Sequence, residues 1–405
     1  MNRRAAHFGA LLLMTTLAAC GPTKTGIEAR EQARERLDIV NAQMTFDQAE
    51  RAFEAGRFER ALDSLEEAIA RYEENPEAHV LHGRIYLETH RLGKAYDAFT
   101  RAAELDEEMA EPIYFLAIIE QRRSNLEEAR DLYMQASELD DQNVQYVLAA
   151  AECLVNMERH EEATDLLMGS LEQFEHNAAM HHLLGQIALL QGELDLAVSR
   201  YSQARMLNPE DIGLLDELAR VQYQAGLYGQ CLDSVTQIQL RSEEPRTDVM
   251  LLKARCLALM ERNPEARNLY LRLTQMREND VDVWIEFGTI AWELGDFRRV
   301  AECSTRVMAL GPDRFEGFML RAINERHKGN MEESISMFQQ AAERSDDEAM
   351  PHVMLGLALE ESGDFMGAMV AYQDATTVEP GNPEATYLIE RLGQFPQVTA
   401  VPTDR

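Results

Sequence analysis

Lysine is scarce in this chain of 405 residues, which contains only Lys24, Lys94, Lys253 and Lys328. Arginine supplies most of the positive charge, and 71 acidic residues against 39 basic ones leave a formal net charge of −32. Such a charge repels phosphate backbones and anionic lipid surfaces, and it steers basic partners toward the protein. The composition therefore argues against nucleic acid as a partner and favours proteins that dock through a basic patch.

The sequence also lacks the common signatures of catalysis. It has no glycine-rich phosphate loop, no HExxH pair and no GxSxG nucleophile turn. We therefore expect no enzymatic activity, no catalytic residues, no cofactor, no metal and no small-molecule substrate.

Only one apolar run stands out, and it lies at the N-terminus. It follows Arg3 and Arg4, has its centre at Leu11–Met14, and ends with Leu-Ala-Ala-Cys at Leu17–Cys20. A basic start, a short apolar core and small terminal residues are typical of a secretory signal peptide, and the run is too short to span a membrane. No later segment is apolar for long enough to cross a bilayer.

The Leu-Ala-Ala-Cys ending resembles the lipobox of bacterial lipoproteins. The resemblance implies that residues 1–19 are removed as a signal peptide and that lipid is attached to the thiol of Cys20; an ordinary signal peptide with an incidental cysteine is the alternative. Because Gly21 follows the cysteine and not aspartate, the resemblance to Gram-negative lipoproteins implies the outer membrane. The sequence does not indicate the side of that membrane, and we expect the periplasmic side because it is the commoner case. Loss of Arg3 and Arg4 would change the net charge from −32 to −34.

Four cysteines follow Cys20, and no two of them form a CxxC pair, which argues against redox or zinc chemistry. An oxidising periplasm permits disulfides. Cys231 and Cys256 fall on consecutive expected helices and are the pair we consider for a bridge. Small buried thiols are the alternative.

The chain contains an internal repeat of about 34 residues. A small residue returns ten times at this spacing, with one step of 35 residues between Ala219 and Ala254. The ten residues are Ala49, Gly83, Ala117, Ala151, Gly185, Ala219, Ala254, Gly288, Ala322 and Gly356. A repeat of this length is typical of a solenoid of helical hairpins and leaves little room for a separate catalytic domain.

We number each unit so that the small residue is position 8, and the units then begin at residues 42, 76, 110, 144, 178, 212, 247, 281, 315 and 349. Position 20 is small in most units, as at Ala61 and Ala95, and position 24 is mostly large, as at Phe99 and Tyr372. This pattern predicts two helices in close approach at positions 8 and 20, with the side chain at position 24 filling the space above that contact.

Turn residues fall between the expected helices. Glycine occupies position 15 in six units, where the first helix must end: Gly56, Gly192, Gly226, Gly295, Gly329 and Gly363. Proline occupies position 32 in three units, where it stops the second helix: Pro209, Pro312 and Pro380.

These residues at this spacing resemble the tetratricopeptide repeat. The units that match it most closely are Gly185…Ala197…Tyr201…Ala204…Pro209 and Gly356…Ala368…Tyr372…Ala375…Pro380. The resemblance covers residues 42–382 and implies an all-α solenoid of ten helix-turn-helix repeats in a right-handed superhelix. It implies a protein-interaction scaffold and does not name the partner.

The segments outside the repeats are expected to cover their ends. Residues 20–41 are charged and helix-prone, and we expect a lipidated linker helix there. Residues 383–393 carry an apolar stripe that predicts a capping helix. We expect residues 394–405 to be disordered.

The repeat pattern weakens in units 6 to 8, and the extra residue falls in the segment Leu240–Asp248. We expect a longer turn there, with a local change in superhelical curvature. Ordinary drift among repeats is the alternative.

By resemblance to the family, positions 2, 5, 9 and 12 of the first helices face a concave groove. The partner-binding residues that we predict at these positions are Arg84, Tyr114, Gln186, Arg220, Tyr223, Arg255, Trp292 and Arg326. Arginine and aromatic residues anchor interfaces, and arginine suits acidic groups or a C-terminal carboxylate. Arginines that merely neutralise neighbouring acids are the alternative. The lysine and asparagine clamp of some family members is absent from positions 5 and 9.

Histidines at His79, His181 and His352 share position 4 with Trp284 and Phe318. A recurring slot for a bulky side chain explains them better than a metal site.

Together these patterns predict a lipid-anchored scaffold of the bacterial cell envelope that docks peptides or helices of other envelope proteins, with the lipid as its only membrane contact. Similarity to family lipoproteins implies roles in assembling pili and secretins or in polysaccharide export. Contact with glycan or peptidoglycan through Tyr114, Tyr223 and Trp292 is the alternative, although two tryptophans in the chain are few for a sugar-stacking surface.

Overall fold

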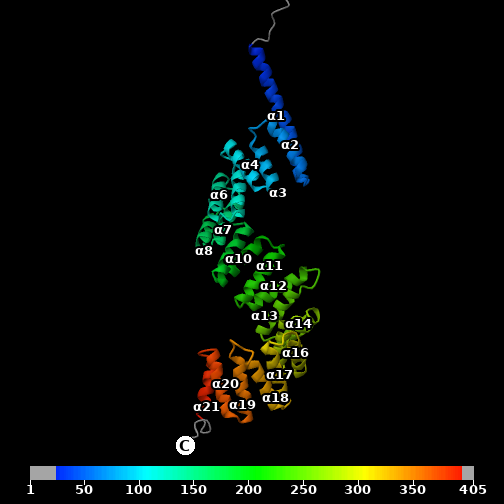
Figure 1. The fold of residues 1–405 in the computed structure, drawn as a ribbon, viewed down its shortest axis with the longest axis vertical. Coiled ribbons are helices and arrows are strands. Elements are labelled where there is room, and N and C mark those ends of the chain that lie inside the picture. Colours follow the sequence, from blue (N-terminus) through cyan, green and yellow to red (C-terminus); the bar gives the residue numbers. More distant parts are fainter. Residues whose placement is uncertain (1–23, 395–405) are drawn as a thin grey trace, which may run out of the picture. The chain divides into compact units, whose positions relative to one another are not determined.

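The computed structural model describes residues 24–394, and within them all regular structure is α-helical, in 21 helices without a strand. The chain divides between residues 187 and 188 into two compact units, whose helices are coloured along the sequence in Figure 1. The described residues form an all-α solenoid of helical hairpins, which confirms the predicted fold class.

In the first unit the odd-numbered helices are the first members of the hairpins and the even-numbered helices are the second. Their bounds are α1 (Lys24–Glu54), α2 (Phe58–Arg71), α3 (Pro76–Glu88), α4 (Leu92–Leu105), α5 (Ala110–Arg122), α6 (Leu126–Leu139), α7 (Val144–Asn156) and α8 (His160–Ser170). Helix α9 (Ala178–Leu190) extends across the division between the units.

The second unit continues the alternation and ends with one additional helix. Its helices are α10 (Leu194–Leu207), α11 (Ile212–Gln224), α12 (Tyr228–Arg241), α13 (Thr247–Leu259), α14 (Asn263–Met276), α15 (Val281–Glu293), α16 (Phe297–Leu310), α17 (Phe315–His327), α18 (Met331–Ala342), α19 (Met350–Ser362), α20 (Phe365–Val378) and α21 (Pro383–Gly393).

The turn inside every hairpin has the same backbone conformation. All six glycines predicted at position 15 have positive φ, for example +68° at Gly56 and +89° at Gly363, which confirms their role in reversing the chain. The other four units place a non-glycine residue there, also at positive φ: His90, Ser124, Glu158 and Glu261. The repeat geometry therefore imposes a left-handed residue at position 15 even where the side chain disfavours it.

Close helix contacts at positions 8 and 20 are also confirmed. All ten residues at position 20, from Ala61 to Ala368, are fully buried. The ring of Phe99 lies so close to Gly83 that a Cβ atom on this glycine would stand 2.6 Å from the ring. The two helices of this hairpin pack closely because Gly83 has only a hydrogen atom beneath the ring of Phe99.

The connection between α12 and α13 is longer than its neighbours, as the extra residue predicts. It comprises residues 242–246, whereas the connections on either side comprise residues 208–211 and 277–280. Two further long connections, residues 171–177 and 343–349, arise because α8 and α18 end early while the 34-residue spacing is kept. The predicted proline stops are confirmed, since Pro209, Pro312 and Pro380 each follow the last residue of a second helix by two positions.

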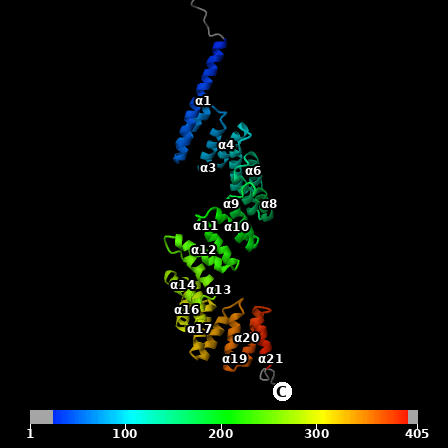
Figure 2. The ribbon, with the colours of Figure 1, turned by 180° about the vertical axis from the view of Figure 1, so that it is seen from behind.

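The ends of the described chain are helical. Helix α1 is continuous from Lys24 into the first repeat, and its N-terminal part projects beyond α2 and α3 in both views (Figures 1 and 2). Helix α21 packs through Ala385, Leu388 and Leu392 onto the core of the last hairpin. Among residues 24–394 no helix is both long and apolar enough to cross a membrane. The expected signal peptide, Cys20 and all but the first residue of the expected disordered tail at residues 394–405 lie outside the described residues.

Candidate functional site

Tyr114, predicted at position 5 of the third repeat, lines a cavity of about 520 Å³ in the first unit. Its ring lies 5.1 Å from the ring of Tyr146 and 5.5 Å from the ring of Phe115, measured between centroids. Helix α5 supplies Tyr114 and Phe115, and the start of α7 supplies Tyr146. The remaining lining residues are Met109, Ala110, Glu111, Asp140, Asn143 and Gln145. A concave surface with several aromatic rings and a few polar groups is typical of ligand-binding sites. We call it the Tyr114 cavity.

Carboxylates give the Tyr114 cavity a negative rim. Glu111 pairs loosely with Arg84 at 3.8 Å, whereas Asp140 forms no ion pair with any residue in the described part of the chain. Burial is the main cause of a raised pKa at Tyr146, and the carboxylates of Asp140 and Glu111 raise it further. The cavity therefore combines aromatic faces with negative potential, and this combination suits a cationic or N–H-rich group.

Arg84, predicted at position 9, lies beside the same cluster of rings. Its guanidinium carbon stands 5.0 Å from the ring centroid of Phe53 and 5.9 Å from that of Phe115. Both distances fall within the usual range for cation–π contacts. Arg84 is thus held by two aromatic residues and by Glu111, and it shows that these rings accept a guanidinium group.

In the second unit, Arg255 forms a two-pronged ion pair with Glu286 of the following repeat, at 2.6 to 3.1 Å. The hydroxyl of Tyr270 donates to the same carboxylate at 2.7 Å. Arg255 also affects the pKa of Tyr223, which burial raises and the guanidinium lowers. The structure therefore brings two of the predicted residues, Tyr223 and Arg255, together around one half-buried carboxylate.

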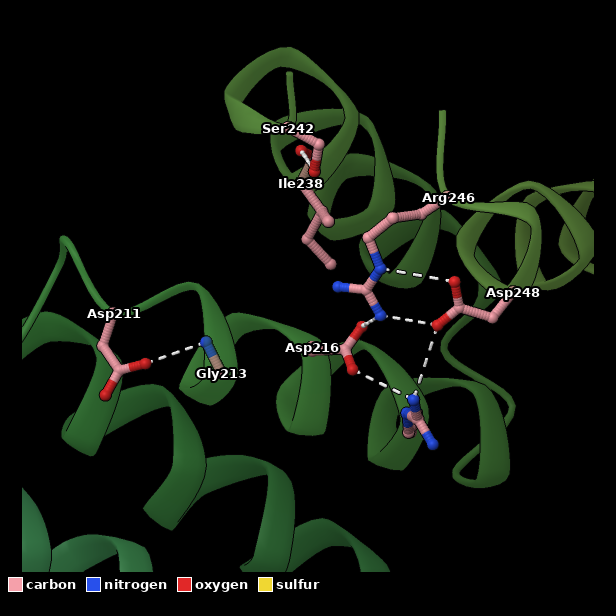
Figure 3. Close-up of polar contacts among 8 residues, drawn as sticks. Asp211, Gly213, Asp216, Ile238, Ser242, Arg246 and Asp248 are labelled. Atoms are coloured by element: carbon pink, nitrogen blue, oxygen red, sulfur yellow. Dashed lines mark hydrogen bonds and ion pairs between the residues drawn. The ribbon is translucent and has the colours of Figure 1, made fainter. Parts of the chain in front are cut away.

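A second network surrounds Arg220. Its guanidinium pairs with Asp216 at 3.0 Å and with Asp248 at 3.7 Å. Figure 3 shows that Arg246 enters from the 242–246 connection and bonds to both carboxylates, at 3.2 Å and 2.5 Å. Two arginines and two aspartates from α11, α13 and the connection between α12 and α13 thus neutralise one another. The pKa of Asp248 is lowered, mainly because its carboxylate accepts a hydrogen bond from Arg246.

The other predicted residues are more scattered. Arg326 pairs with Glu361 of the next repeat at 2.5 Å. Trp292 is 43% exposed. Gln186 lies 3.4 Å from His182, measured between the Nε2 atoms. Cys20 lies outside the described residues, and its lipidation stays a prediction.

All four predicted arginines thus have carboxylate partners within this chain, as the alternative interpretation holds. Exposed ion pairs contribute only about 0–1 kcal/mol each, so an incoming acidic group could replace such a partner at small cost. The pairing nevertheless removes the reason to expect an acidic ligand in particular. Partner binding by these arginines stays a prediction.

Sequence reasoning missed several residues of these sites. Phe53 occupies position 12 of the first repeat, so the positional rule could have found it. Phe115, Asp140 and Tyr146 lie at positions that the rule does not include. Phe115 and Asp140 belong to the same repeat as Tyr114, whereas the packing of the next repeat brings Tyr146 to it. Arg246 lies in the long connection, beside a cavity of about 380 Å³ that includes Lys253 and Arg272 in its lining.

The recurrent bulky residues at position 4 have a structural role. The side-chain nitrogens of His79, His181 and Trp284 lie 2.8 to 2.9 Å from the backbone carbonyl six residues earlier. Trp284 can only donate, and a protonated Nε2 gives the two histidines the same bond. This contact tethers the preceding connection to the first helix. Across residues 24–394 no group of histidines, cysteines and acids is arranged to hold a metal ion.

The four described cysteines are free thiols, and all are buried. Cys231 and Cys256 pack in one core cluster of the second unit. The hydrogen bond between their thiols, with burial, raises the pKa of Cys231. In the structure Cys231 and Cys256 are therefore two free thiols without a disulfide bond between them.

Comparison with known proteins agrees with the repeat pattern. Residues 46–110 match the family model described as tetratricopeptide repeat. Tetratricopeptide repeat protein 8 of Homo sapiens is 25% identical over 124 residues, and the protein of the same name from Mus musculus is 26% identical over the same length. The match spans 31% of this chain but only 23% and 24% of those relatives.

Solved structures show a similar fold. A tetratricopeptide repeat protein from Parabacteroides merdae superposes with a TM-score of 0.43 at 15% identity, over 60% of this chain and 96% of its own. Pseudomonas aeruginosa pilF superposes with a TM-score of 0.41 at 20% identity, over 50% of this chain and 92% of its own. The type IV pilus biogenesis factor PilW superposes with a TM-score of 0.43 at 17% identity, over 50% of this chain and 95% of its own. These likenesses concern the fold alone. The comparisons support the tetratricopeptide repeat family, and the family model itself covers residues 46–110.

Proposed function

We propose that this protein is a tetratricopeptide-repeat lipoprotein of the bacterial cell envelope that docks segments of other envelope proteins and catalyses no reaction. The repeats supply a series of helical hairpins, and the lipobox-like sequence at Cys20 supplies a membrane anchor. The residue after Cys20 favours the outer membrane, and the periplasmic side is the commoner location for such lipoproteins. The pathway is left to be identified through the partner.

The Tyr114 cavity is the observation that carries this proposal. Its volume of about 520 Å³ is enough for one or two side chains of a docked segment. Tyr114, Phe115 and Tyr146 offer apolar faces, while Glu111 and Asp140 offer negative charge. A segment with a basic side chain next to an apolar one fits this chemistry, and the net charge of −32 would steer such a segment inward.

Affinity isolation after mild cross-linking tests the proposal, using the tagged full-length protein in detergent-solubilised membranes. The cavity variant Glu111→Gln, Asp140→Asn removes both charges and keeps side chains of nearly the same shape. Its matched control, Glu77→Gln, Asp106→Asn, makes the same changes at the same two repeat positions one unit earlier. We expect mass spectrometry to find the same partners with the parent and the control, and to lose them with the cavity variant.

Other outcomes assign the binding elsewhere or refute it. A triple variant, Arg220→Ala, Tyr223→Ala and Arg255→Ala, tests the predicted partner-binding residues of the second unit in the same assay. Partners lost only with the triple variant would move the docking site to the second unit. Partners retained by every variant would place it on neither surface, and the absence of any partner with the parent would contradict the scaffold proposal.

Two further experiments test the rest of the proposal. Cys20→Ala should move the protein from the membrane fraction to the soluble fraction if Cys20 carries the lipid. Retention of the parent on purified peptidoglycan, with no protein partner in the isolation, would favour the glycan alternative, because aromatic rings with nearby carboxylates also suit sugars.

A further inference from the structure

One face of α1 is apolar within the first repeat and mainly acidic in the N-terminal part of the helix, residues 24–41. In the first repeat α1 packs inward through Ala42, Phe46 and Ala49, which are all buried. The same face, followed toward the N-terminus at three- and four-residue spacing, is mainly acidic: Asp38, Glu35, Glu31 and Glu28 lie there between Lys24 and Ile39, which is 40% exposed. This part of the helix therefore has little apolar surface to bury against the repeats.

The opposite face of the same segment is apolar. Ala33, Leu37, Val40 and Met44 follow one another at spacings of four, three and four residues, so they form one line along the helix. We call this line the outer stripe. It points away from the repeats, with Leu37 59%, Val40 56% and Met44 59% exposed.

Three exposed arginines border the outer stripe, Arg30 and Arg34 on one side and Arg36 on the other. The segment thus separates its charges, with acids toward one face and arginines around the apolar line. The two faces are about 10 Å apart across the helix, which exceeds the Debye length of about 8 Å at physiological salt. A surface that touches the outer stripe therefore experiences mainly the arginines, although the chain as a whole is strongly acidic.

We propose that the outer stripe of α1 lies on an anionic phospholipid surface, with Leu37, Val40 and Met44 at the boundary of the acyl chains and the arginines among the headgroups. A helix with an apolar line, flanking basic residues and a polar opposite face has the pattern of an interfacial helix. Membrane contact is then not confined to the lipid. The face of α1 that packs against the repeats is turned away from the bilayer.

This inference rests on the lipid anchor of the proposed function. Cys20 precedes Lys24 by four residues, which span at most about 14 Å of extended chain. A lipid at Cys20 would hold α1 next to the bilayer and make its contact intramolecular, so even a short apolar line would remain bound. Without the tether, an apolar line of four residues is too short to hold the whole protein on a membrane.

Spin labels in the lipidated full-length protein test the proposal. Leu37→Cys and Glu35→Cys place a nitroxide on the outer stripe and on the acidic face, and the native thiols at Cys153, Cys231, Cys256 and Cys303 are buried and do not compete. The protein is reconstituted in phosphatidylethanolamine vesicles containing one quarter phosphatidylglycerol. We expect membrane-dissolved oxygen to reach the label at position 37 and an aqueous nickel chelate to reach the label at position 35.

Charge variants in the Leu37→Cys background provide the control. Arg30→Gln, Arg34→Gln and Arg36→Gln together should shift the label at position 37 toward the nickel chelate, as should neutral phosphatidylcholine vesicles. The matched change of Glu28→Gln and Glu31→Gln should not. A label at position 37 that stays with oxygen after loss of all three arginines would overturn the electrostatic part of the proposal.

Flotation of the protein with the vesicles separates the two proposals. If the protein floats but both labels favour the nickel chelate, the anchor holds and the inference about α1 is wrong. A label at position 37 shielded from both reagents would mean that a second copy or a protein partner covers the stripe, which also overturns it. If the protein does not float, the anchor fails and this inference falls with it.

Discussion

Arg255 and Glu286, from consecutive repeats of the second unit, form a two-pronged ion pair in which Nη2 and Oε1 are 2.6 Å apart. Glu286 also accepts from Tyr270, so one carboxylate connects three helices. Its side chain is only 26% exposed. Such a carboxylate depends on its partners more than one in open solvent does.

Loss of this pair should therefore destabilise the second unit. We expect Arg255→Leu to cost about 1–2 kcal/mol, between the values for exposed and fully buried pairs. The matched control is Arg262→Leu, which breaks the exposed pair with Glu265 on α14 and should cost less, because solvent screens that pair. Guanidinium denaturation of the full chain measures both. Equal losses would show that the 255–286 pair is an ordinary surface contact.

Substitution of Gly356 and of Gly229 by alanine should have opposite effects on stability. A Cβ atom at Gly356 would lie 2.3 Å from the ring of Tyr372, so we expect Gly356→Ala to cost about 1–3 kcal/mol. Gly229 lies within α12 with open space around its Cα, so Gly229→Ala should stabilise by about 0.5–1 kcal/mol through helix propensity. Hydrogen exchange in α19 and α12 reports each change locally. A neutral Gly356→Ala variant would contradict the close packing.

The non-glycine turn residues should be sites of stabilisation. His90, Ser124, Glu158 and Glu261 have φ of +59° to +65°. A left-handed conformation costs a non-glycine residue about 1–2 kcal/mol, and substitution by glycine removes this cost. The greater freedom of glycine in the unfolded chain offsets part of the resulting gain in stability. We expect each glycine variant to gain about 0.5–1 kcal/mol, measured by thermal and chemical denaturation. Destabilisation by all four glycine variants would show that contacts of the native side chains contribute more to stability at these turns than relief of backbone strain does.

Acid should destabilise the first unit through His82. Burial lowers the pKa of His82 to about 4, with the charges of His79 and Lys94 as smaller causes. A lowered folded-state pKa gives stability that is present above the unfolded value near 6.5 and is lost as pH falls toward 4. The loss is at most about 3 kcal/mol, since each pKa unit corresponds to about 1.4 kcal/mol and this ring is partly solvated.

His82→Phe should flatten that pH dependence, because the ring can no longer become charged. Denaturation of the parent and the variant from pH 7 to pH 4 measures it. A variant as acid-sensitive as the parent would show that another group causes the loss.

The buried thiols should not react in the folded protein. Burial raises the pKa of Cys153 to about 11 and that of Cys303 to about 12, so thiolate is scarce at pH 8. We expect a Cys20→Ser protein purified from the periplasm to react with a disulfide reagent only after unfolding, and then at all four cysteines. Two reactive thiols, rising to four after reduction, would instead reveal a bridge between Cys231 and Cys256.

Much of the fold follows from residues that act within one repeat. Gly83 beneath Phe99, and Gly56 at positive φ, are local requirements of a hairpin, and their spacing in the sequence is enough to predict them. The early ends of α8 and α18 were missed because the 34-residue spacing continues across the longer connections that follow them.

The site was less predictable, because it depends on contacts between repeats. Position in the repeat was enough to select Tyr114 and Arg255 as candidates. It did not show that Glu286 would bind Arg255, or that Tyr146 would meet Tyr114 across a cavity, since these pairs lie 31 and 32 residues apart in the sequence. Their distances depend on how successive hairpins stack.

The central claim is that a partner segment enters the Tyr114 cavity, and site-specific photo-cross-linking tests it most directly. A benzophenone amino acid replaces Tyr114 in one protein and Tyr387, which is 62% exposed on α21, in a control. Illumination of intact cells should give a covalent adduct with an envelope protein from position 114 and none from position 387. An adduct from position 387 alone, or equal adducts from both, would contradict docking at the cavity.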